Sequence, residues 1–215
     1  MGELGFFNFQ VVTQDIEGLT DARGESIKAM LKSDYSISVN SVRVVLGYQV
    51  KSDISKKEAE RAIYDLFADP IIEFGTLDKS VIDNKKLFPK APEIAITVGF
   101  KPGVTDNAGQ AGLDGLRTIF PQISEQSQIS TTMTYLFWGI SNDISPTWLA
   151  SKLHNQMIER ASISDRKECS ISNWPKLDFP ERPVLIEQPS ATVNLEVSDE
   201  ELIEISEKGL LALNL

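Results

Sequence analysis

Two aspartates stand in the same short pattern at two places in the chain, and a carboxylate there could bind a metal ion or lie beside a phosphate. Asp21 belongs to Gly18-Leu19-Thr20-Asp21-Ala22-Arg23-Gly24, and Asp106 to Gly103-Val104-Thr105-Asp106-Asn107-Ala108-Gly109. Each precedes a helix-like segment, where a carboxylate caps free N–H groups and is favoured by the helix dipole. We therefore predict that both aspartates cap helices. The glycine spacing fits neither a Walker-type nor a Rossmann-type phosphate loop.

The other side chains that could do chemistry are isolated. His154 is the only histidine and Cys169 the only cysteine, whereas a metal centre or a catalytic triad needs several partners. Glu200 and Glu201 lie in the first turn of a predicted helix, which explains this acidic pair without acid–base chemistry. We therefore predict no catalytic, cofactor-binding or metal-ligating residue in this chain.

The elements around the two aspartate segments recur in the same order. Residues 7–12 and 94–99 alternate with the period of two of a half-buried strand. After each segment comes an amphipathic helix, and then a β-rich stretch at 39–50 and at 129–140, with Gly47 and Gly139 as possible bends. Gly24 and Gly109 would allow close backbone packing or left-handed geometry. The apolar positions of the two helices are Ile27, Met30 and Leu31, and Leu113, Leu116 and Ile119.

A second helix is predicted in each half. Ser55 with Glu58 forms a capping box before residues 56–67, and Ser145 precedes proline at the start of residues 146–161. In the latter, Leu149, Leu153 and Met157 form an apolar stripe. The tryptophans at 138, 148 and 174 are expected to fill a core or an interface, and Trp148 suits an interface between the halves.

These patterns predict an α+β fold of two ferredoxin-like units, residues 1–85 and 86–168, each reading β-α-β-β-α. The first unit ends in a strand at 71–77. The last strand of the second is not evident and is expected within 163–171 or from the tail at 193–197. Because each unit leaves a sheet edge to cover, we expect a pseudo-dimer.

We expect residues 169–215 to form a proline-rich, extended linker and the start of a linker helix, which a capping box from Ser198 to Glu201 would begin. The apolar pattern that follows is unfinished, so we expect the chain to continue past Leu215.

Residues 9–74 resemble the PurS subunit of phosphoribosylformylglycinamidine synthase. The matching segments are Gly18-Leu19-Thr20-Asp21-Ala22-Arg23-Gly24, Val39-Asn40-Ser41-Val42-Arg43 and Leu66-Phe67-Ala68-Asp69-Pro70-Ile71-Ile72-Glu73. In the second unit residues 101–109 match the opening segment well, but the V-R strand and the D-P-x-I-E ending are missing. Residues 198–215 look like the linker that leads into the catalytic subunit of the same enzyme.

The resemblance implies a non-catalytic N-terminal assembly module of a fused, purine-biosynthetic amidotransferase of the PurL family. Its partners would be a synthetase domain downstream and a glutaminase domain or subunit, with a possible dimer through sheet edges. The parent enzyme would use ATP, Mg²⁺ and glutamine to convert formylglycinamide ribonucleotide to the amidine; none of these is expected to bind this part. The alternative is a free-standing tandem ferredoxin-like (ACT-type) ligand sensor or adaptor, and an independent small enzyme ranks last.

Composition narrows the partners further. The net charge of −10 argues against a nucleic-acid partner, because such binding depends on clustered Lys and Arg. No apolar run approaches the roughly 20 residues that span a bilayer, and the N-terminus does not have the pattern of a secretory signal. A single cysteine suits a reducing compartment, so we expect a cytoplasmic protein.

Overall fold

A computed structural model describes residues 4–164, 175–181 and 193–209 of the chain. Its contacts divide the chain into two compact units, Met1–Arg182 and Pro183–Leu215. In the second unit, helix α5 (Asp199–Gly209) begins as predicted, because Ser198 Oγ accepts a hydrogen bond from the Glu201 amide and the Glu201 carboxylate accepts one from the Ser198 amide. The predicted domain boundaries at 85 and 168 stay predictions.

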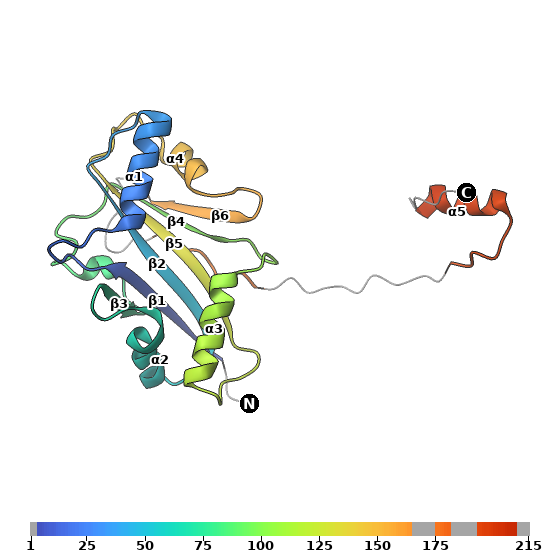
Figure 1. The fold of residues 1–215 in the computed structure, drawn as a ribbon, viewed down its shortest axis with the longest axis horizontal. Coiled ribbons are helices and arrows are strands. Elements are labelled where there is room, and N and C mark those ends of the chain that lie inside the picture. The colour runs from blue at the N-terminus through green and yellow to red at the C-terminus, as the bar shows by residue number, and fades with distance from the viewer. Residues whose placement is uncertain (1–3, 165–174, 182–192, 210–215) are drawn as a thin grey trace. The chain divides into compact units, whose positions relative to one another are not determined.

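The compact unit Met1–Arg182 has the predicted α+β class, with helices packed on one six-stranded antiparallel sheet (Figure 1). The strand order is β3-β1-β2-β5-β4-β6. The two longest strands, β2 and β5, pair along the middle of the sheet from Ser41 opposite Trp138 to Lys51 opposite Gln128. The strands are β1 (Gly5–Thr13), β2 (Ser41–Ser52), β3 (Glu73–Leu77), β4 (Ile94–Phe100), β5 (Gln128–Trp138) and β6 (Glu159–Ser164).

Four helices cover one face of this sheet, and Figure 1 shows α1 and α3 lying across it. Ser55 and Glu58 form the predicted capping box, and Ser145 accepts from the Trp148 amide with proline at the first helical position. The helices are α1 (Ala22–Tyr35), α2 (Lys56–Ala62) with a π-helical turn η1 (Ile63–Phe67), α3 (Asn107–Ile119) and α4 (Pro146–Leu153).

The core forms on both faces of the sheet. On the helix face, Phe9 and Val50 pack with Leu113 and Leu116 of α3, and a second cluster packs β2, β4 and β5 against α1 and α4. On the opposite face, one end is covered by the connection between β3 and β4, which contains the 3-10 turn η2 (Val81–Asp83). The rest of this opposite, helix-free face is polar.

The predicted element order within each half is wrong in one respect: each half reads β-α-β-α-β. The stretches at 39–50 and 129–140 each form one long strand instead of two. Gly47 lies inside β2, where a Cβ would come within 2.2 Å of Thr132 Oγ1 on the paired strand, so glycine makes room for the threonine and does not bend the chain. Gly139 does turn the chain, with φ +65° just after β5.

The second half also differs from its prediction near its end. α4 stops at Leu153 and not near residue 161, because His154 adopts an extended backbone. Met157 therefore leaves the predicted apolar stripe and is 83% exposed in a turn. The final strand, β6, begins at Glu159, earlier than expected, and residues 165–171 of the predicted range lie outside the described residues. The alternative range, 193–197, contains no strand.

Across the described parts of the chain, no helix combines the length and apolar character that crossing a membrane would require.

Candidate functional site

The first aspartate segment joins the start of α1 to strand β2. Gly18 takes a left-handed φ of +81° and turns the chain into the helix. One carboxylate oxygen of Asp21 accepts from the Gly24 amide at 3.0 Å, and the other accepts from the Val44 amide of β2 at 2.8 Å. Gly24 lies against β2 so closely that a Cβ would come within 2.2 Å of the Val42 carbonyl oxygen.

The second segment makes the same contacts between α3 and β5. Gly103 has φ +85°. Asp106 accepts from the Gly109 amide at 2.7 Å and from the Thr131 amide at 2.6 Å. A Cβ on Gly109 would come within 2.5 Å of the Ile129 carbonyl oxygen. The capping role predicted for both aspartates is confirmed. Each carboxylate also accepts a hydrogen bond from a strand amide, which holds its helix against that strand.

Gly24 and Gly109 are predicted to allow either close backbone packing or a left-handed backbone, and the structure shows close packing. Neither Gly24 nor Gly109 has a positive φ. Among the described residues, no group of three or more histidine, cysteine, aspartate or glutamate side chains is arranged to hold a metal ion. The aspartate segments are therefore structural joints between a helix and a strand.

A second shared joint precedes the last strand of each half. In residues 69–73 the Asp69 amide donates to the Glu73 carboxylate at 2.9 Å, the Ile71 amide donates to the Asp69 carboxylate at 2.8 Å, and the Glu73 amide donates to the Asp69 carbonyl at 2.8 Å. These bonds hold a compact turn that ends in the apolar pair Ile71 and Ile72.

Residues 155–159 make the same three bonds. The Asn155 amide donates to Glu159 at 2.6 Å, the Met157 amide donates to the Asn155 side chain at 3.0 Å, and the Glu159 amide donates to the Asn155 carbonyl at 2.8 Å. The D-P-x-I-E sequence itself is absent from the second half, as predicted, but residues 155–159 form the equivalent turn, with asparagine in place of aspartate and glutamine in place of proline. The signal was an Asx residue four positions before a glutamate, but the helical spacing of Leu149, Leu153 and Met157 obscured it.

The V-R strand is not repeated. Arg43 donates to the Thr13 carbonyl, and its Nε lies 3.9 Å from Asp21 Oδ2. Its guanidinium also lies over the Phe88 ring, 5.3 Å from the ring centroid. By the strand register Ser130 occupies the corresponding place in β5 and supplies no cation. The predicted absence of this motif in the second half is confirmed.

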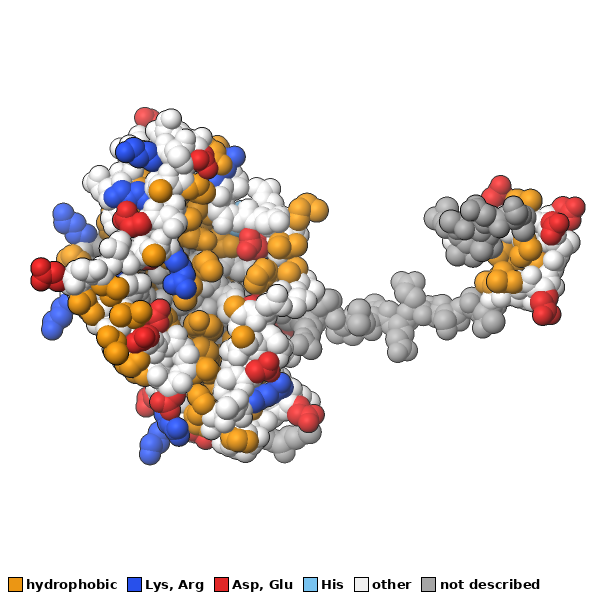
Figure 2. Space-filling model, in the orientation of Figure 1, with side chains coloured by type: hydrophobic (Ala, Val, Ile, Leu, Met, Phe, Trp, Pro, Cys, Tyr) orange, Lys and Arg blue, Asp and Glu red, His pale blue; other side chains and the backbone are white. Residues whose placement is uncertain are grey.

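Several apolar side chains remain exposed to solvent on the helix face and at the turns that precede the last strand of each half. Leu46 and Met133 are paired at the middle of β2 and β5, and Met133 is 42% exposed. The tips of the two shared turns are more exposed still, with Ile71 at 75% and Met157 at 83%. Figure 2 shows hydrophobic side chains across this face between α1 and α3.

Trp148 lies where α4 of the second half meets α1 of the first. Its ring packs edge-on against Tyr35, the last residue of α1, with centroids 5.2 Å apart. Lys152 lies over both rings. Trp148 thus contacts α1, and its assignment to an interface between two units stays a prediction.

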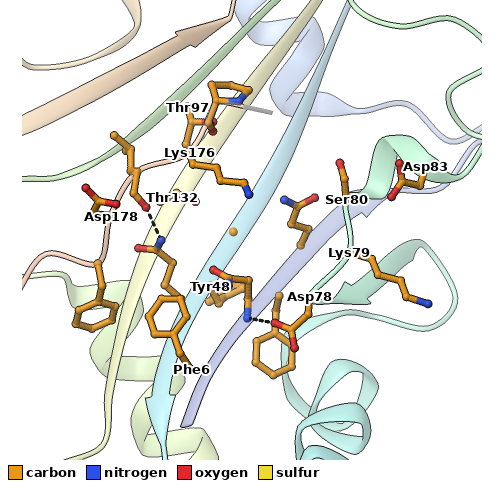
Figure 3. A pocket seen from close by; sticks show the side chains of 18 residues that line it. Phe6, Tyr48, Asp78, Lys79, Ser80, Asp83, Thr97, Thr132, Lys176 and Asp178 are labelled. Carbon is orange, nitrogen blue, oxygen red and sulfur yellow. Dashed lines mark hydrogen bonds between the residues drawn. The ribbon is translucent and has the colours of Figure 1, made fainter. Parts of the chain in front are cut away.

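The helix-free face contains a pocket of about 550 Å³ (Figure 3). Its floor consists of side chains from β1, β2, β4 and β5. One wall is the turn after β3, and the other is an extended strap, residues 175–181. The strap is the described part of the predicted extended linker, and it is bound to the sheet along its length.

Polar contacts hold the strap at several points, and one of them is a hydrogen bond that the Arg160 guanidinium donates to the Asp178 carbonyl. Thr97 Oγ1 donates to the Pro175 carbonyl at 2.7 Å, Gln49 Nε2 donates to the Leu177 carbonyl at 2.7 Å, and Lys51 pairs with Glu181 at 2.9 Å. Phe179 adds an edge-on contact with Phe6, with centroids 5.9 Å apart. The strap therefore closes one side of the pocket.

His154 and Trp138 are not among the residues that line the pocket. His154 Nδ1 is 2.6 Å from the Ala150 carbonyl oxygen at the end of α4. Trp138 stacks on Phe88 and donates to the Lys90 carbonyl. Glu200 and Glu201 lie in the first turn of α5, as predicted. Cys169 and Trp174 lie outside the described residues.

Three groups have perturbed pKa values. Burial, and then the charge of Glu73, raises the pKa of Tyr48, and burial followed by the charge of Glu159 raises that of Tyr135. Both rings lie on the helix face, where the neutral phenol is favoured. Hydrogen bonds from Ser55 lower the pKa of Glu58, which is the carboxylate of the capping box.

The sequence matches no model of a known protein family and has no significant match among curated proteins.

Proposed function

We propose that this chain is the N-terminal assembly module of a phosphoribosylformylglycinamidine synthase. It consists of two PurS-like units that pair as an intramolecular pseudo-dimer, followed by a linker toward the synthetase part. The module itself carries out no chemistry. It holds the synthetase, which consumes ATP and formylglycinamide ribonucleotide, in register with the glutaminase that supplies ammonia.

The observation that carries this proposal is the repetition of the two joints. The G-x-x-D-x-x-G segments of the two halves make the same hydrogen bonds, although the sequences of the halves have diverged. The joints make Val44 of β2 equivalent to Thr131 of β5, an offset of 87 residues (131 − 44 = 87). Leu46 and Met133, which face each other at the centre, have the same offset (133 − 46 = 87), so equivalent residues pair there. Such self-complementary pairing is what a two-fold interface between like units produces. The PurS-like motifs of the first half give the units their family.

The exposed turn tips support a scaffolding role. Ile71 and Met157 close equivalent turns, one in each half, and each is more than two-thirds exposed. Exposed apolar side chains in a repeated, hydrogen-bonded setting are suited to protein contacts. Two such tips favour a partner that meets both halves at once.

The test is a reconstitution with the synthetase and glutaminase parts produced as separate polypeptides. The 215-residue chain alone should not turn over formylglycinamide ribonucleotide, and adding it to the other two parts should raise glutamine-dependent amidine formation. Ammonia-dependent formation should change less, because the synthetase then needs no glutaminase. Turnover by the chain alone, or no effect of adding it, would refute the proposal.

The surface is tested with the double variant Ile71→Ser and Met157→Ser. Both side chains are exposed, so the chain should fold normally, while its affinity for the other parts should fall about tenfold or more. Phe6→Ser, which also removes an exposed apolar side chain but from the helix-free face, is the matched control.

A further inference from the structure

The floor of the pocket on the helix-free face carries no charged side chain, and uncharged polar groups surround the single aromatic ring of Phe6 there. Asn8 and Gln10 come from β1, Gln49 from β2, Thr132 from β5 and Thr97 from β4. An apolar ligand would bury these amides and hydroxyls without partners, which is unfavourable. The floor therefore selects a ligand rich in hydrogen-bonding groups.

The charged side chains of the pocket lie on its two walls, and each wall has both acidic and basic residues. The turn after β3 supplies Asp78, Lys79 and Asp83, and the strap supplies Lys176 and Asp178. A phosphate would meet more carboxylates than ammonium groups, and a polyamine would meet Lys176. A ligand with one positive and one negative group matches such walls best.

Lys176 is the cation placed to meet the negative group. In Figure 3 its side chain extends across the pocket, whereas that of Lys79 points away from it. Within the described residues Lys176 Nζ makes no ion pair or hydrogen bond. Its charge is therefore available to a ligand.

Two lining residues hold buried polar atoms without partners. Among the residues that the structure describes, Gln49 Oε1 has no hydrogen-bond donor, although Nε2 of the same amide donates to the strap, and Ser80 Oγ in the turn after β3 has no partner either. Buried groups of this kind normally have partners, and the exceptions need a reason. Gln49 lies in the floor beside the strap and Ser80 in the opposite wall. Both atoms are shielded from solvent, so a ligand reaches them only when the strap or the turn moves.

We propose that this pocket binds a zwitterionic amino acid between the sheet and the strap. The carboxylate pairs with Lys176 and Ser80, and the ammonium group is held by Gln49 Oε1 and Asp178. The volume of about 550 Å³ lies within the usual range for small-molecule sites, roughly 300–1,000 Å³. Because the strap forms one wall of the pocket, a bound amino acid also holds residues 175–181 more firmly against the sheet. The proposal does not depend on the assembly function.

The experiment is calorimetric titration of the 215-residue chain with each standard amino acid in turn, together with hydrogen exchange of residues 175–181. At least one amino acid should bind saturably and slow exchange in the strap. The corresponding amine without the carboxylate, and the acid without the amine, should each bind about tenfold or more weakly.

Lys176→Met should raise the dissociation constant by about tenfold or more, and Lys79→Met should leave it within about twofold. Both variants remove one exposed lysine from the pocket wall, so a folding defect would affect them alike. The proposal is overturned if no amino acid binds, if the two lysine variants bind equally well, or if binding leaves exchange in the strap unchanged.

Discussion

Gly109→Ala and Gly112→Ala place the same methyl group one helical turn apart in α3, and the structure predicts opposite effects on stability. At Gly109 the new Cβ would come within 2.5 Å of the Ile129 carbonyl oxygen. This oxygen belongs to the backbone of β5, so the helix or the strand must move. At Gly112 the nearest atom would be Ile129 Cδ1 at 3.6 Å, an ordinary contact.

The magnitudes follow from two opposing terms. Alanine is favoured over glycine inside a helix by up to about 1 kcal/mol, and a methyl group forced into close packing costs about 1–3 kcal/mol. Gly112→Ala gains the first term alone and should stabilise the protein by about 0.5–1 kcal/mol. Gly109→Ala incurs the packing cost, and its gain in helix propensity is smaller because residue 109 lies near the helix start. It should therefore destabilise the protein by about 1–2 kcal/mol.

Urea unfolding followed by circular dichroism measures both variants against wild type, with the shift in midpoint converted through a common m-value. A gap of about 1.5–3 kcal/mol corresponds to a separation of roughly 3–12 °C in Tm for a chain of this size. Gly24→Ala should behave like Gly109→Ala, because its Cβ would come within 2.2 Å of a carbonyl oxygen. If Gly109→Ala is as stable as Gly112→Ala, the close-packing role of these glycines is wrong.

Three further predictions concern single contacts. Asp106→Ala removes a helix cap and leaves the Thr131 amide unpaired, so it should lower the free energy of unfolding in urea by about 2–4 kcal/mol; the exposed Asp114→Ala in the same helix should change it by less than about 0.5 kcal/mol. Hydrogen bonds from its capping serine lower the pKa of Glu58 from the ordinary value of a glutamate, so the carboxylate adds stability that is present above that ordinary pKa and is lost as the pH falls through the folded-state pKa. The advantage of wild type over Glu58→Gln in urea unfolding should therefore shrink in acid, and a constant difference would contradict this cause. A double-mutant cycle of Tyr35→Ala and Trp148→Ala should give a coupling energy of about 0.5–1.5 kcal/mol, and additivity would show that the rings do not interact.

The fold class and the helix starts were predictable because they rest on local rules. The caps at Asp21, Asp106, Ser55 and Ser145 each depend on one side chain and the next three amides, and all four are present. The alternation in β1 likewise reports one buried face. Such signals survive divergence because they need no information about the rest of the fold.

The errors arose where a distant contact decides the local structure. Gly47 looked like a bend, yet it is required by Thr132 on a strand far along the chain. The stripe through Leu153 and Met157 looked helical, yet hydrogen bonds between Asn155 and Glu159 end the helix. The pocket could not be predicted at all, since its walls come from a turn and a strap with no regular pattern.

The helix-free face is where the two halves differ most, and this difference explains why the first half has a polar pocket floor. By the register about Leu46 and Met133, Gln49 corresponds to Leu136. Leu136 is fully buried beneath the connection between β3 and β4, whereas Gln49 holds the strap and lines the pocket. A leucine at position 49 would cover the pocket floor, and a glutamine at position 136 would be buried without an obvious partner. Each side chain therefore suits the segment that crosses its half of the sheet. Within the described part of the chain each of these segments occurs once and the helix-face joints occur twice, so repetition favours a symmetric partner on the helix face and a single ligand on the other.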